Sequence, residues 1–75
     1  MTNEKFYQKL LLEYLINKVK SNIDIIDTLR AMVCEIYTED YINKTRTSTK
    51  KYIKAIKKLE KENENNRKYI RKLNV

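Results

Sequence analysis

Glycine and proline are both absent from this 75-residue chain, and so are histidine and tryptophan. Without glycine or proline, tight hairpin turns of the primed types lose the residues that suit them best. Without histidine there is no imidazole base and no His metal ligand, and without glycine there is no phosphate-cradling loop. Most all-β folds and most enzyme classes are therefore disfavoured. We expect an all-α protein that is not an enzyme and that holds no cofactor or metal.

The size of the chain limits how it can be stabilised. At 9.1 kDa it has room for a single domain, residues 1–75, and a core this small rarely supplies more than about 3–5 kcal/mol. One cysteine, Cys34, cannot form an internal disulfide. Oligomerisation is the remaining common means of stabilising a small chain, so we expect a homo-oligomer. A lone cysteine also fits a reducing compartment, which favours the cytoplasm.

Three helical segments can be recognised in the order of polar and apolar residues, at about 3–20, 22–43 and 49–73, with a loop over about 43–49. The first is apolar around most of its circumference, which is typical of a helix packed on more than one side. Ser21 followed by Asp24 resembles a helix start and predicts that the first two segments form a hairpin. Because this interruption is short, one long bent helix is the alternative.

The third segment has apolar and amide residues spaced alternately four and three apart. The seven positions of this heptad seam are Tyr52, Ile56, Leu59, Asn63, Asn66, Ile70 and Leu73. Such a repeat predicts a coiled coil, and a buried Asn in it can fix register and oligomer number. We expect the seam to form the oligomer interface. The alternative is a helix of an antiparallel bundle whose middle is exposed to solvent.

Positive charge is concentrated in the second half of the chain. Residues 41–75 hold twelve basic and three acidic residues, whereas residues 1–40 hold five basic and seven acidic ones. Opposite the seam, seven lysines share one face and form what we call the lysine ridge: Lys50, Lys54, Lys57, Lys58, Lys61, Lys68 and Lys72. Lys44 and Arg46 extend it into the loop, where neighbouring hydroxyl groups suit phosphate contacts.

These features favour a small non-enzymatic regulator that acts by protein–protein binding through its helical faces, of the inhibitor, antirepressor or adaptor type. The alternative is a nucleic-acid-binding protein that uses the lysine ridge without reading sequence. An acidic protein or nucleic acid is thus the expected partner, with a membrane surface disfavoured because Asn63 and Asn66 interrupt the apolar face. Tyr41 and Tyr69 lie at the edges of apolar arcs and are candidates for partner contact. A simpler interpretation of the ridge is a solvated helix face.

Overall fold

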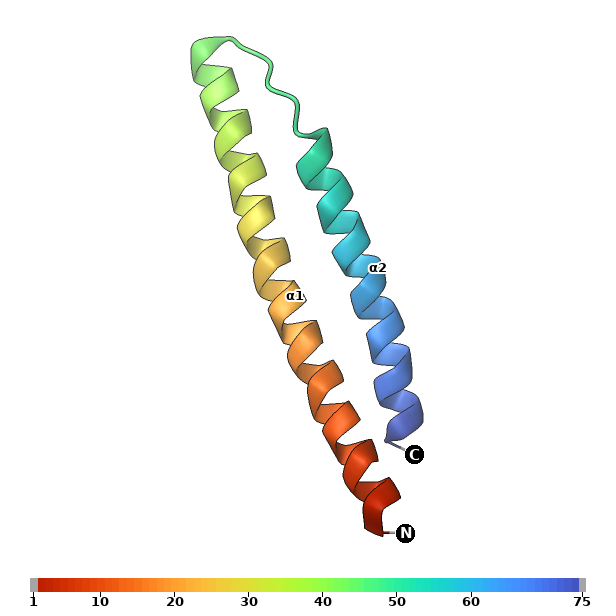
Figure 1. Ribbon diagram of the computed structural model, residues 1–75. Helices are drawn as coiled ribbons and strands as arrows, with labels where there is room; N and C mark the ends of the chain where they lie inside the picture. Colours follow the sequence, from red (N-terminus) through yellow and green to blue (C-terminus); the bar gives the residue numbers. More distant parts are fainter. Residues whose placement is uncertain (1, 75) are drawn as a thin grey trace.

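The chain folds into an antiparallel hairpin of two helices, shown in Figure 1, a computed structural model that describes residues 2–74. Helix α1 spans Thr2–Asn43 and α2 spans Lys50–Leu73. The hairpin is a rod of 64 × 15 × 14 Å. Because α1 has 42 residues and α2 has 24, the first turns of α1 extend past the end of α2 (Figure 1).

The all-α expectation is confirmed, but the expectation of three helices is wrong. The expected segments 3–20 and 22–43 are one continuous helix, and no break occurs at Ser21. Ser21 is exposed, while Asn22 after it points into the interface with α2 and is 1% exposed. Ser21 and Asp24, which resembled a helix start, are both exposed side chains within the helix, and Asn22 between them is buried against α2. Packing against α2 keeps the backbone helical through them, as tertiary contacts often override local preference.

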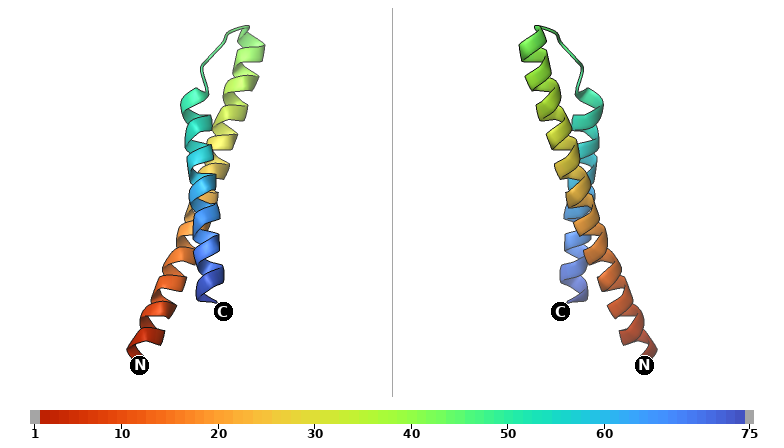
Figure 2. Two further views of the ribbon diagram at one scale, coloured as in Figure 1. Left: turned by 90° about the vertical axis from the view of Figure 1, so that its right-hand side faces the viewer. Right: turned by 90° about the vertical axis from the view of Figure 1, so that its left-hand side faces the viewer.

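A second heptad repeat runs along α1 and forms its face toward α2. Within residues 4–43, every side chain of α1 that is not exposed belongs to a series spaced alternately three and four apart: Leu12, Leu15, Val19, Asn22, Ile26, Leu29, Val33, Ile36 and Asp40. This spacing keeps one stripe of a helix in register with a partner helix. The hairpin is accordingly a short antiparallel coiled coil, whose helices cross at a shallow angle and diverge toward the chain termini (Figure 2).

The heptad seam of α2 faces α1 of the same chain. Ile56 and Asn63 are buried there, and the other five seam residues are half-buried. The seam was expected to pair with a second copy, and in the single chain α1 takes that place. The alternative of a bundle helix with an exposed middle does not match, because Asn63, in the middle of the seam, is 2% exposed.

One hydrogen-bonded amide pair lies at the centre of the interface. Asn22 Nδ2 donates to Asn63 Oδ1 at 2.9 Å, and Asn63 Nδ2 donates to the Val19 carbonyl at 3.3 Å. Asn22 Nδ2 also lies 3.2 Å from Glu62 Oε1. Since a buried amide without a partner costs about 1–3 kcal/mol, the helices are held in the one register that brings Asn22 and Asn63 together. Aliphatic residues alone would tolerate other registers far better.

The loop begins with a left-handed residue. Lys44 has φ 55°, and the Thr45 N–H donates to the Asp40 carbonyl at 3.0 Å. This is the Schellman arrangement that commonly ends helices, with lysine where glycine is usual. Thr49 precedes α2, and its carbonyl accepts hydrogen bonds from the N–H groups of Tyr52 and Ile53.

The Asp40 side chain organises the same loop. Its carboxylate accepts hydrogen bonds from the Thr47 N–H at 2.7 Å and from the hydroxyls of Thr45 and Thr47, both at 2.8 Å. The Thr47 N–H, followed by the Thr45 hydroxyl, lowers the pKa of Asp40 below its ordinary value of 3.8. At the α2 end of the loop, the hydroxyls of Tyr37 and Thr49 lie 3.2 Å apart.

Replacing Asn63 with alanine should lower the free energy of unfolding by about 1–3 kcal/mol, because the Asn22 amide and the Val19 carbonyl lose a buried partner. The matched control is Asn66→Ala, on the same seam but only half-buried, which should cost much less. Urea denaturation followed by circular dichroism measures both. Equal losses in the two variants would show that the amide pair has no special role.

Replacing Lys44 with glycine should raise the free energy of unfolding by about 1 kcal/mol, because glycine accepts a positive φ without a steric penalty. Lys44→Ala removes the same charge but keeps the strained backbone, and should change little. Thermal denaturation compares the two. An equal gain in both variants would assign the effect to the charge.

Replacing Asp40 with asparagine should lower the melting temperature at neutral pH. A pKa lowered by folding means that the ionised carboxylate stabilises the hairpin above pH 3.8, and that this contribution is lost as the pH falls through the lower pKa of the folded state. The difference in melting temperature between wild type and Asp40→Asn should therefore shrink on acidification. A difference that stays constant from pH 7 down to about pH 2 would contradict the assignment.

Candidate interaction surfaces

The lysine ridge forms the outer face of α2. All seven of its lysines are exposed, and they lie on the side of α2 that faces away from α1. At 1.5 Å per residue, the ridge from Lys50 to Lys72 runs for about 33 Å. Lys51 and Arg71 are exposed beside it and add to its charge.

The acidic residues of α2 do little to neutralise the ridge. Glu60 accepts a hydrogen bond from Arg30 of α1 at 2.8 Å, and Glu62 lies 3.9 Å from Lys18 Nζ. Both acids therefore interact across the interface with α1. Glu64 lies 3.8 Å from Lys68, so Lys68 is the one ridge lysine with an ion pair among the described residues. Exposed pairs of this kind contribute about 0–1 kcal/mol and leave the field of the ridge positive.

The loop extends the positive surface less than the sequence suggested. Lys44 and Arg46 are both exposed at the end of the hairpin. The hydroxyls of Thr45 and Thr47, expected to be free for phosphate contacts, instead donate to the Asp40 carboxylate. The loop thus offers two cations beside an acidic residue, and the continuous basic surface is that of α2.

A second surface is the outer face of the first turns of α1, which we call the apolar end: Phe6, Tyr7, Leu10, Leu11 and Tyr14. These five side chains are between 46% and 66% exposed, and the Phe6 and Tyr7 rings meet edge to face at 5.9 Å. The sequence of this segment, apolar around most of its circumference, predicts a helix packed on more than one side, whereas here only one side is packed. Leu12 and Leu15 belong to the heptad repeat of α1 and face α2. The five residues of the apolar end lie outside the repeat and stay exposed.

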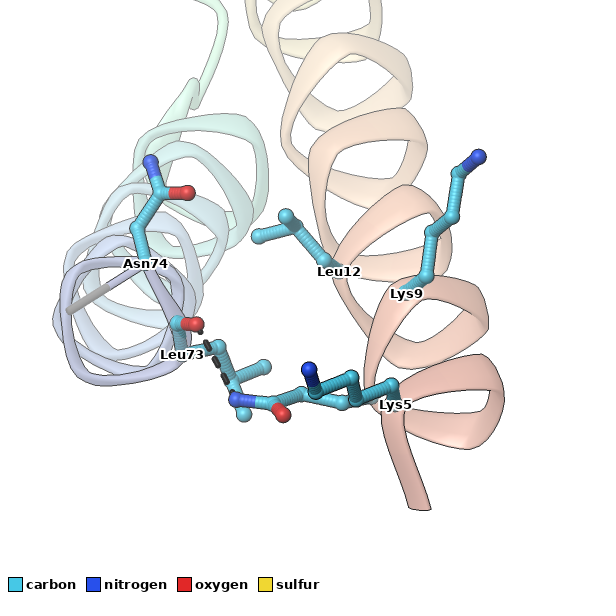
Figure 3. A pocket seen from close by; sticks show the side chains of 6 residues that line it. Lys5, Lys9, Leu12, Leu73 and Asn74 are labelled. Carbon is cyan, nitrogen blue, oxygen red and sulfur yellow. Dashed lines mark hydrogen bonds between the residues drawn. The ribbon is translucent and has the colours of Figure 1, made fainter. Parts of the chain in front are cut away.

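Figure 3 shows the open end of the hairpin, where a shallow depression separates the two helices. Leu12 points from α1 toward α2, and the Gln8 side chain donates to the Leu73 carbonyl at 3.1 Å, while Lys9 points away (Figure 3). The Gln8 contact with Leu73 marks the last turn of α2, beyond which α1 continues toward its N-terminus. Lys5 and Asn74 complete the rim of the depression.

Cys34 is free and exposed, and no cluster of three or more His, Cys, Asp or Glu side chains in residues 2–74 could hold a metal ion. Neither α1 nor α2 has a run of residues that is long and apolar enough to cross a membrane. What the chain presents is two surfaces for contact, one basic and one apolar.

Comparison with known protein families, with curated protein sequences and with solved structures finds no match for this chain, so its two surfaces have to be interpreted from their own chemistry.

Proposed function

We propose that this chain is a small non-enzymatic binding protein that holds nucleic acid by its phosphates along the lysine ridge. The observation that carries the proposal is the continuous exposure of all seven ridge lysines on the outer face of one helix. Clustered like charges repel one another, and an anionic partner that spans the ridge relieves this repulsion. A nucleic acid strand presents negative charges at regular intervals, so several lysines can be neutralised at once.

The shape of α2 suits such a partner. At about 36 Å, the helix is about as long as ten base pairs of duplex DNA at 3.4 Å each. The ridge is made of lysines, which act as point charges, whereas base reading relies mostly on the bidentate contacts that Arg, Asn and Gln make with base edges. We therefore propose binding that depends on charge and is independent of base sequence.

The salt dependence of binding tests the proposal. If four or five lysines contact phosphates of duplex DNA, log affinity should fall with log salt concentration at a slope of roughly −4. Replacing Lys54 and Lys61 with glutamine should make that slope about 1.8 less negative and weaken binding to all sequences alike. Fluorescence anisotropy on duplexes of different sequence measures both effects.

The matched control removes two lysines from α1 instead. Lys5→Gln with Lys20→Gln makes the same change in net charge but leaves the ridge intact, since both residues are exposed on the other helix. It should leave the slope within a few tenths of the wild-type value. Equal effects of the two double variants would mean that net charge alone drives binding. If wild type binds neither duplex DNA nor structured RNA at about 50 mM salt, the proposal fails.

The protein-binding regulator expected from the sequence is the second candidate, with an acidic protein on the same ridge. It is favoured by Tyr69, which is 58% exposed and has Lys72 Nζ 5.7 Å from its ring centre. Asn65 and Lys68 border the shallow depression beside it. Exposed tyrosines are enriched in protein interfaces. A partner captured equally well with and without nuclease treatment, and not displaced by competitor DNA or RNA, would favour this candidate over nucleic acid.

A further inference from the structure

The hairpin exposes far more surface than its mass requires. Its accessible surface is 6638 Å². A compact monomer of 9.1 kDa exposes about 4,900 Å² by the usual scaling of area with mass. The excess of about 1,700 Å² is roughly twice the 800 Å² that each partner buries in a standard protein interface. A second copy of the chain could cover one such area on each hairpin and still leave the ridge free.

The apolar end is the part of this surface least suited to water. It lies on the outer side of α1, and Phe6 and Tyr7 precede Gln8, whose contact with Leu73 marks the end of α2. Single exposed apolar side chains are ordinary, whereas five large ones that adjoin one another within three turns mark an interaction site. We infer that this face pairs with the same face of a second copy, with the two α1 helices antiparallel about a two-fold axis near Leu11.

The charges around the apolar end support this antiparallel register. When Leu11 faces Leu11 of the other copy, residues whose numbers add up to about 22 lie opposite each other. In an antiparallel pair, equivalent flanks of the two helices meet. Glu4 then faces Lys18 on the flank that carries Leu11. Both side chains are exposed and opposite in charge, so they are placed to form a complementary pair, and Lys18 Nζ lies 3.9 Å from Glu62 Oε1 of its own chain. In the same register Tyr7 comes beside Tyr14.

The proposed interface does not use the ridge. The apolar end belongs to α1, and the ridge faces away from α1 on the other helix. Pairing of two copies and binding of nucleic acid can therefore be tested separately. Either proposal can be contradicted while the other holds.

Sedimentation equilibrium of the full chain at micromolar concentration tests the inference. Wild type should sediment at twice the 9.1 kDa of one chain. Leu10→Glu should raise the dimer dissociation constant by about a hundredfold, because a two-fold interface buries the new charge twice. Its matched control is Ala31→Glu, an exposed residue three heptads further along the same face of α1, which should leave the dimer intact. Circular dichroism checks that both variants remain helical.

A charge exchange tests the register. Glu4→Lys alone should weaken the dimer, because it faces Lys18 of the other copy, and adding Lys18→Glu should restore the wild-type dissociation constant. A wild-type mass of 9.1 kDa would overturn the inference and leave the apolar end to a different protein. It would also be overturned by a mass above that of a dimer, by equal dissociation of the Leu10→Glu and Ala31→Glu variants, or by failure of the exchange to restore pairing.

Discussion

The hydrogen-bonded pair of Asn22 and Asn63 is the constraint on which the rest of the hairpin depends. Both side chains are almost fully buried, at 1% and 2% exposed, between layers of aliphatic residues such as Val19, Ile26 and Ile56. Aliphatic contacts supply most of the favourable energy but distinguish poorly between neighbouring registers. A shift of α2 along α1 by one heptad would place each amide against aliphatic groups, without a partner. The pair therefore selects one alignment of the helices and sets where every outer face lies.

That alignment determines which charges stay free. Glu60 and Glu62 lie at the border of the interface, where Arg30 and Lys18 of α1 approach them. Two of the three acids of α2 are thus directed toward α1, and the lysines remain on the far side. The same alignment leaves Phe6 and Tyr7 beyond the Gln8 contact with the end of α2 and turns Leu10, Leu11 and Tyr14 to the outer side of α1, so the apolar end stays exposed. Both the lysine ridge and the apolar end are therefore set by the same alignment of α1 and α2.

The main difference between sequence and structure lies at Ser21 to Asp24. Taken locally, a serine followed three residues later by an acid predicts a helix start, and the segments on either side were interpreted as separate helices. The series from Leu12 to Asp40 passes through this point without interruption, and Asn22 belongs to it. The repeat could have been found in the sequence, but an all-round apolar segment hides one stripe among several. What decides between the two interpretations is the Asn63 amide, which lies 41 residues away.

The sequence by itself determined the helical class, the loop and second helix, and the face that carries the lysine ridge, because helical periodicity and the absence of glycine and proline are local properties. It also placed Asn63 on a seam with the correct spacing. Only the tertiary structure decided that α1 is continuous, that the seam packs within the chain, and that Phe6, Tyr7, Leu10, Leu11 and Tyr14 stay exposed. A heptad seam is the same whether it meets its own chain or another. Its partner is selected by which buried amide finds a hydrogen bond, and that contact joins residues far apart in sequence.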